Sequence, residues 1–219
     1  MKRLSFYVLS VAFLATGMSS CGKTTRGKMI NDWKVASSTS EETFISMNGE
    51  DKTVMTETIA DNAITQKFVH TFAGGDSSET GSTEGKVNVN SWAIKKDGTW
   101  TWNKEVEYVG AGGQGQKGIT NQSGTWSFIA KNKEDGFKKN ERVLFNVLSY
   151  EFTQQSLNNG TVVSTNSTVD TYLTGQSVMI FTVKDSNNKL LEMEMDSDSK
   201  YTIQNNNSQR INKLSVRLK

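Results

Sequence analysis

The sequence predicts a single all-β domain, folded as a barrel, with a β-sandwich as the alternative fold. Apolar and polar residues alternate from Trp33 onward, which is the period of a half-buried strand. Fewer than a third of the residues after Cys21 are apolar, too few for the broad apolar stripes of a helical bundle. Turn signals recur at hairpin spacing, and the ~190 residues after the N-terminal segment suit one domain.

The first twenty residues have the layout of a bacterial secretion signal. Lys2 and Arg3 precede the apolar residues 4–17, a stretch too short to span a bilayer comfortably. Cys21 follows and is the only cysteine, so it has no intramolecular disulfide partner. An unpaired cysteine directly after residues 18–20 (MSS) resembles the lipobox of bacterial lipoproteins, in which the cysteine sulfur carries a diacylglyceryl group.

This resemblance implies a signal peptide over residues 1–20, a lipidated polar tether over residues 21–28 and a barrel domain over residues 29–219. Two or three acyl chains on Cys21 would attach the domain to a membrane essentially permanently. Asp after the cysteine marks inner-membrane retention in Gram-negative lipoproteins, but this chain has Gly22 there. The expected location is therefore the cell envelope, as an outer-membrane lipoprotein facing the periplasm, with the cell surface as the alternative.

The charge balance excludes a basic, nucleic-acid-binding protein. The chain has 25 Lys and Arg against 23 Asp and Glu, and the excess comes from Lys2 and Arg3. Removing residues 1–20 leaves equal numbers of each sign. Nucleic-acid affinity rests mainly on neutralised phosphate charge, so we expect no nucleic acid partner.

Eight to ten strands are expected at hairpin spacing, from eleven candidate segments. After a first strand near Trp33, they cover residues 53–59, 64–72, 87–96, 99–109, 124–131, 142–155, 160–169, 177–184, 189–196 and 211–218. Within residues 64–72, period two places Ile64, Phe68, His70 and Phe72 on one face.

The clearest hairpin lies at Asp97-Gly98, because this pair tolerates the positive φ angles of a two-residue type I′ turn. That turn predicts that Ala93 faces Trp102 and that Trp92 lies on the opposite face. A three-residue turn with a bulge is the alternative, and it would shift the register by one and reverse the buried face.

Two phosphate-binding patterns are accidental matches. The P-loop pattern over residues 17–24 would be cut by cleavage before Cys21, and a signal sequence precedes it in place of a strand. The dinucleotide pattern over residues 113–118 is not followed by helix-forming sequence. We interpret it as a flexible Gly-rich loop between strands.

Three short motifs resemble those of the lipocalin-like lipoproteins of Bacteroidetes. They are residues 31–35 (NDWKV), 96–100 (KDGTW) and 124–128 (GTWSF). Family members typically carry a Trp-Lys-Leu/Val strand, an Asp-Gly-Thr hairpin and a Gly-Thr-Trp strand. The resemblance covers residues 29–219 in arrangement, although the first strand lacks the Gly-x-Trp of true lipocalins. It implies a single small antiparallel up-and-down barrel, lipocalin-like, with an open end suited to a hydrophobic molecule.

The chain offers few residues for catalysis or metal binding. His70 is the only histidine, and no nucleophile-elbow sequence accompanies it. Residues 196–198 (DSD) resemble the start of a calcium loop but lack its glycine and closing glutamate. We therefore expect no enzyme, no metal site and no cofactor.

Aromatic side chains are the remaining candidates for function. Phe68, His70, Phe72, Trp102 and Tyr108 are the candidate ligand-binding residues, with core filling as their alternative role. The favoured function is binding of a small hydrophobic ligand inside the barrel. The alternative is an interaction subunit of an envelope protein complex, with a filled barrel and polar loops that dock a protein partner.

Overall fold

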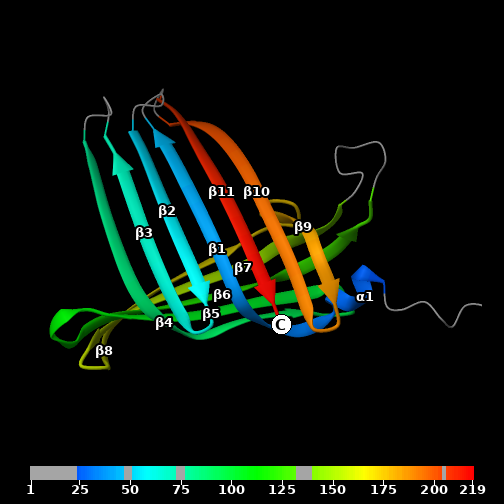
Figure 1. The fold of residues 1–219 in the computed structure, drawn as a ribbon, viewed down its shortest axis with the longest axis horizontal. Helices are drawn as coiled ribbons and strands as arrows, with labels where there is room; N and C mark the ends of the chain where they lie inside the picture. Colours follow the sequence, from blue (N-terminus) through cyan, green and yellow to red (C-terminus); the bar gives the residue numbers. More distant parts are fainter. Residues whose placement is uncertain (1–23, 47–50, 73–76, 132–139, 204–205) are drawn as a thin grey trace, which may run out of the picture.

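A short helix precedes eleven antiparallel strands in the described part of the chain, which comprises residues 24–46, 51–72, 77–131, 140–203 and 206–219 of a computed structural model (Figure 1). The helix α1 covers Thr25–Met29, and the 3-10 turn η2 covers Ala111–Gly113. The strands are β1 (Asn31–Ser46), β2 (Asp51–Ala60), β3 (Ala63–Thr71), β4 (Ser78–Ile94), β5 (Thr99–Val109), β6 (Gln114–Ile129), β7 (Glu141–Asn158), β8 (Thr161–Thr171), β9 (Val178–Asn187), β10 (Leu190–Ile203) and β11 (Asn206–Leu218).

Ten of the described strands close into a barrel. Hydrogen-bonded neighbours follow the order β6, β5, β4, β3, β2, β1, β11, β10, β9 and β7, and β7 pairs with β6 to complete the circle. The strand β8 lies outside this circle, because it pairs with the second half of β7 while β9 pairs with the first half. In Figure 1, β1, β2, β3, β10 and β11 form one wall, and β5 to β8 cross behind it. The prediction of a single antiparallel barrel is confirmed.

An aromatic core fills the barrel near the C-terminus. Trp92, Trp100, Phe145 and Phe181 are fully buried, and the centroids of their contacting rings lie 5.0 to 6.0 Å apart. Stacked and edge-to-face aromatic contacts of this kind add to the free energy gained by burial. This end of the barrel is therefore packed with side chains.

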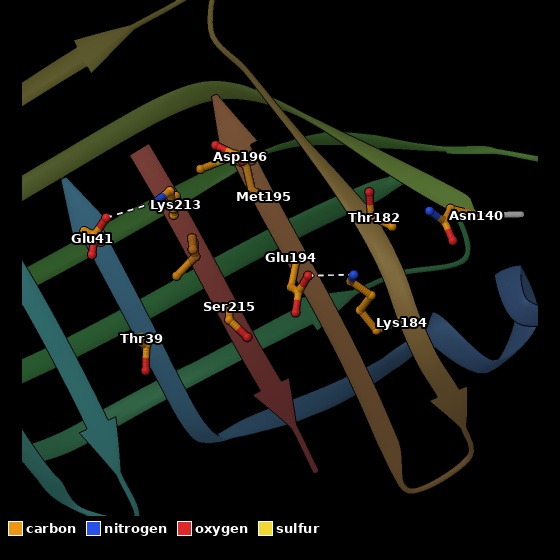
Figure 2. A pocket seen from close by; sticks show the side chains of 11 residues that line it. Thr39, Glu41, Asn140, Thr182, Lys184, Glu194, Met195, Asp196, Lys213 and Ser215 are labelled. Atoms are coloured by element: carbon orange, nitrogen blue, oxygen red, sulfur yellow. Dashed lines mark hydrogen bonds and ion pairs between the residues drawn. The ribbon is translucent and has the colours of Figure 1, made fainter. Parts of the chain in front are cut away.

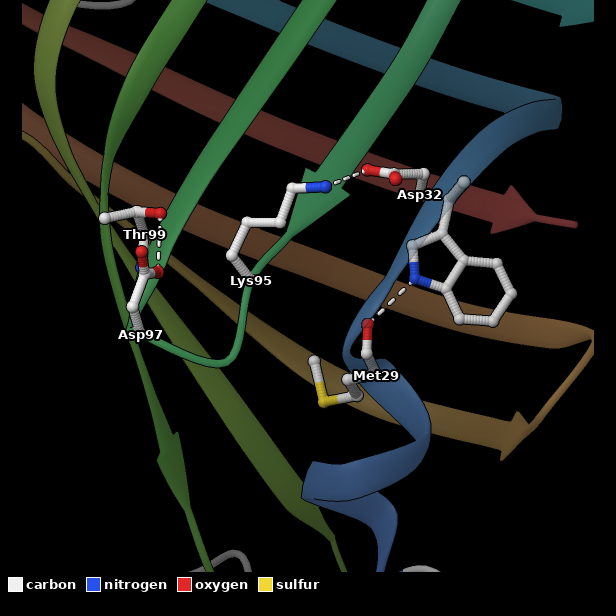
Figure 3. Close-up of polar contacts among 6 residues, drawn as sticks. Met29, Asp32, Lys95, Asp97 and Thr99 are labelled. Atoms are coloured by element: carbon white, nitrogen blue, oxygen red, sulfur yellow. Dashed lines mark hydrogen bonds and ion pairs between the residues drawn. The ribbon is translucent and has the colours of Figure 1, made fainter.

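The helix α1 packs against this core and includes the last residues of the predicted tether. Thr24 caps it by accepting a hydrogen bond from the Gly27 amide at 3.3 Å. Met29 is fully buried, and its carbonyl accepts a hydrogen bond from Trp33 Nε1 at 2.8 Å (Figure 3). The predicted signal peptide and Cys21 lie outside the described residues.

Among the described residues, no helix has both the length and the apolar character that crossing a membrane requires.

The predicted two-residue turn at Asp97-Gly98 is wrong. The Lys95 amide donates to the Thr99 carbonyl at 2.9 Å, so the loop holds three residues, and Gly98 has φ +87°. The Asp97 carboxylate accepts hydrogen bonds from the amide and the hydroxyl of Thr99 at 2.9 and 2.7 Å (Figure 3). The neighbouring strand holds the same loop, because the Trp126 amide donates to the Gly98 carbonyl at 2.8 Å.

This register also corrects the predicted position of Trp92. Trp92 faces Trp102 across the hairpin, with ring centroids 5.6 Å apart, and therefore does not lie on the opposite face. The three-residue turn was the alternative, and as expected it reverses the buried face of β4 next to the turn, where Trp92 and Ile94 are buried.

Residues 114–118 do not form the predicted loop. β6 begins at Gln114 and pairs with β5 on one side and β7 on the other. Both flanking strands satisfy its backbone groups, which outweighs the low strand propensity of glycine. Gly115 also allows close approach, because an added Cβ would lie 2.7 Å from the Tyr108 carbonyl oxygen.

Candidate ligand cavity

A cavity of about 280 Å³ lies between the wall formed by β2 and β3 and the wall formed by β5, β6 and β7. Side chains alternate across a strand, so each wall directs every second residue toward this space. The side chains and backbone that line it belong to Glu57, Gln66, Lys104, Val106, Tyr108, Gln116, Lys117, Gly118, Thr120, Phe152 and Gln154.

An ion pair connects the two walls of this cavity. Lys104 Nζ lies 2.5 Å from Glu57 Oε1, and Gln66 Nε2 donates to Glu57 Oε2 at 3.1 Å. The side chains of Lys104 and Glu57 are only 13% and 21% exposed. β2 and β5 are separated by β3 and β4 in the sheet, so the pair spans the interior. The opposite charges compensate each other, so Glu57, Gln66 and Lys104 form a polar layer without net charge.

Tyr108 adds an unused hydrogen-bonding group next to this layer. Its hydroxyl oxygen is buried and has no hydrogen-bond partner in the described part of the chain. Burial, and secondarily the negative charge of Glu57, raises the pKa of Tyr108 to about 12. The phenol is therefore neutral at physiological pH and can donate a hydrogen bond to a bound molecule.

A second hollow, of about 580 Å³, adjoins the first near the connection between β5 and β6. Gln66, Tyr108 and Gln116 line both hollows, while Val109 and Leu157 add apolar surface to the second. The two hollows thus share part of their lining, and Val163 of β8 also borders the second one. Most of the side chains in both linings are polar, and the apolar surface comes from a minority that includes Val106, Phe152 and Leu157.

The five predicted ligand-binding residues do not gather at this space. Tyr108 lines both hollows, but none of the other four lines either hollow. Phe68 and Phe72 are 42% and 38% exposed, and Trp102 donates its indole N–H to Asn90 Oδ1 at 2.9 Å.

His70 lies beside Phe72, with ring centroids 4.4 Å apart, and its Nδ1 is 2.7 Å from the Thr53 hydroxyl. The structure thus brings the rings of His70 and Phe72 into contact, but neither residue lines the hollows beside Tyr108. A ligand-binding role for the five residues as a group stays a prediction.

Ten of the eleven residues that line the cavity were not predicted, and among the three that form its polar layer only Lys104 and Glu57 carry a usable signal in the sequence. Lys104 has the same strand parity as Trp102 and Tyr108, and Glu57 has the same parity as Ile59. A charged residue at an apolar position of the alternation indicates an inward-facing polar group that needs a partner. Gln66 has no comparable signal, because an isolated amide is common on either face of a strand.

A third hollow, of about 390 Å³, is bordered by β1, β9, β10 and β11 and carries a mixed-charge surface (Figure 2). Lys213 lies 3.1 Å from Glu41, and Lys184 lies 2.7 Å from Glu194. These four side chains are between 41% and 57% exposed, so water screens them and their ion pairs contribute little. Its charged side chains are therefore more exposed to water than Lys104 and Glu57 in the cavity beside Tyr108.

The described residues contain no cluster of three or more His, Cys, Asp or Glu side chains that could hold a metal ion. No family model, curated protein or solved structure matches the chain.

Proposed function

We propose that the protein is an envelope lipoprotein, held on the outer membrane by lipid on Cys21, whose barrel binds a small amphipathic molecule without converting it. The observation that carries this proposal is the pair of adjoining hollows of about 280 and 580 Å³. Ligand pockets typically measure about 300–1,000 Å³, so the larger hollow falls within this range and the smaller lies at its lower limit.

The lining suggests the chemistry of the ligand. Val106, Phe152 and Leu157 offer apolar surface, which favours a hydrocarbon or ring body. Lys104 and Tyr108 lie beside that surface and favour a polar end that accepts a hydrogen bond. Among hydrophobic molecules, we therefore expect the ligand to be one with a single polar end.

The proposed anchor rests on the signal-like residues 1–20 and on Cys21. Replacing Cys21→Ser should move the protein from the membrane fraction to the soluble envelope fraction, because each lost acyl methylene removes about 0.8 kcal/mol of membrane affinity. Unchanged membrane association of this variant would argue against the lipid anchor.

Ligand binding is tested with the purified chain from Gly22 onward. An apolar fluorescent probe is titrated in and then displaced with single-chain fatty acids, monoacylglycerols and isoprenoid alcohols. Gly118→Leu should abolish saturable binding, since an added Cβ would already contact Val106 at 3.4 Å and Phe152 at 3.7 Å, which leaves the rest of the side chain in the cavity.

The matched control is Ser127→Leu, which adds the same side chain at an exposed position of the same strand. This variant should bind like the parent chain. Equal binding by both variants, or no saturable binding by the parent, would contradict the proposal.

A second candidate function, a subunit of an envelope protein complex, is favoured by the complete exposure of β8. Co-purification of a defined complex with the tagged chain would support it. The complex should then be lost when exposed residues of β8 are replaced with lysine.

A further inference from the structure

The strand β8 presents a free sheet edge. Among the described residues it pairs only with β7, and all of Thr161–Thr171 is exposed. Such an edge offers backbone N–H and C=O groups to another strand, and proteins usually protect it with lysine, proline or bulges. β8 contains neither lysine nor proline, and its only protection is a register shift opposite Ser156 and Leu157.

The sequence of β8, TVVSTNSTVDT, reads almost the same in both directions about Asn166. An antiparallel pair of β8 strands with a two-fold axis at Asn166 would therefore place similar residues opposite each other. The resulting pairs are Thr161 with Thr171, Val162 with Asp170, Val163 with Val169, Ser164 with Thr168 and Thr165 with Ser167.

Charge and apolar exposure both suit this arrangement. Asp170 is the only charged residue of β8, and the two-fold register places it opposite Val162 and away from its own copy. Like charges opposite each other are thereby avoided. Val163 and Val169 are each 61% exposed, and each would cover the other across the pair.

We propose that two copies of the protein associate through antiparallel pairing of their β8 strands about Asn166, which joins the sheets of the two barrels. One strand pair buries less surface than the ~1,200 Å² of a stable interface, so the association should be weak and should depend on concentration. Attachment to one membrane would favour it by raising the local concentration.

A register-specific disulfide tests this pairing. The chain from Gly22 onward lacks Cys21 and contains every described residue, so one added cysteine is unique. Asn166→Cys should form a disulfide dimer under mild oxidation, because facing residues of antiparallel strands have Cα atoms about 4.5–5.5 Å apart, within disulfide range. Ser164→Cys should not, because it would face Thr168 of the other copy. A mixture of Ser164→Cys and Thr168→Cys chains should form the mixed disulfide.

Sedimentation equilibrium provides the second measurement. Combining Thr165→Lys with Ser167→Lys should raise the dimer dissociation constant at least about tenfold, because the four added charges meet across the axis. Thr80→Lys with Ser82→Lys, at exposed positions of β4, adds the same charge and should leave association unchanged.

Several outcomes would overturn the proposal. They are a parent chain that stays monomeric at about millimolar concentration, equal cross-linking at positions 164 and 166, and association that survives the lysines on β8. Capture of a different protein by β8 without self-association would likewise overturn it in favour of a heteromeric contact. Thermal melts of all variants establish that they remain folded.

Discussion

Tyr108 and Lys104 show how single residues give the cavity its polar character. Each lies at an inward position of β5, where an apolar side chain would pack more simply. The Lys104 charge is compensated by Glu57, whereas the Tyr108 hydroxyl has no partner among the described residues. An uncompensated buried hydroxyl costs free energy of folding, and a ligand can recover that cost by accepting its hydrogen bond.

Replacing Tyr108→Phe should therefore separate stability from binding. We expect the free chain to gain about 1 kcal/mol of unfolding free energy, since an unsatisfied buried group is removed. Binding of a ligand with a polar end should weaken about tenfold, as for the loss of one hydrogen bond. Urea unfolding and probe displacement measure the two quantities, and a loss of both would show that the hydroxyl supports the fold.

The raised pKa of Tyr108 predicts a specific alkaline transition. In the folded chain this phenol ionises near 12, whereas in the unfolded chain tyrosine ionises near 10. Its contribution to stability is therefore constant below about pH 10 and is lost as pH rises from about 10 to about 12. Ultraviolet titration should show a late phenolate step, which Tyr108→Phe removes; an unchanged last step would contradict the assignment.

The ion pair in the cavity should matter more than one on the surface. Lys104→Met leaves Glu57 partly buried without its partner, and we expect a loss of about 1–3 kcal/mol, less than for a fully buried pair because both side chains retain some exposure. Lys184→Met breaks the exposed pair with Glu194 and should cause no measurable change. Urea unfolding compares the variants, and equal effects would exclude a special role for the interior pair.

At the scale of elements, the turn between β4 and β5 decides which tryptophans meet. Gly98 has φ +87°, and the three-residue loop aligns Trp92 with Trp102. Asp97-Gly98 is compatible with more than one turn length, so the dipeptide alone does not fix the register. Contacts from β6 to the loop carbonyls of Gly98 and Lys95, both made by Trp126, select the longer turn.

This turn predicts a difference between two substitutions at one position. Gly98→Val should destabilise the chain by about 1–2 kcal/mol, because a β-branched residue disfavours positive φ. Gly98→Asn should stay close to the parent, because asparagine tolerates the left-handed region. Thermal unfolding measures both, and equal stability of the two variants would argue against the left-handed conformation.

The strand segment over residues 78–86 was not predicted, and the structure shows the physical cause. Residues 78–86 of β4 lack inward apolar side chains, because Gly81 and Gly85 stand where rings of neighbouring strands fill the space. An added Cβ at Gly81 would lie 2.2 Å from the Phe68 ring, and one at Gly85 would lie 2.6 Å from the Tyr108 ring. Alternation disappears from a strand when its neighbours supply the apolar contacts, so period two could not reveal these residues.

For the molecule as a whole, the two ends of the barrel differ in packing. At one end, the side chains of Trp33 and Leu218 are buried. At the other end, Met55 and Phe68 lie at inward-facing positions of β2 and β3 but are 52% and 42% exposed. Local stability follows the burial of apolar side chains around a segment. One end should therefore hold the barrel together while the other remains accessible.

Amide hydrogen exchange should reveal this gradient within single strands. In β1, amides near Trp33 and Val35 should exchange more slowly than those near Phe44, although the same strand contains both groups. The same contrast is expected in β11 between Val216 and Arg210. Uniform protection along both strands would show that the barrel opens only as one unit.

The sequence by itself determined the all-β class and most strand positions, because period-two alternation reports directly on half-buried strands. It favoured a barrel and left a β-sandwich as the alternative, and the pairing of β6 with β7 in the structure decided for the barrel. The sequence also supplied the hairpin at Asp97-Gly98 and placed Tyr108 among the candidate site residues. Only the tertiary structure decided the turn length, the partners of Trp92 and the contact between Glu57 and Lys104. These features depend on which strands lie beside each other or face each other in the barrel, and alternation within one strand carries no information about its neighbours.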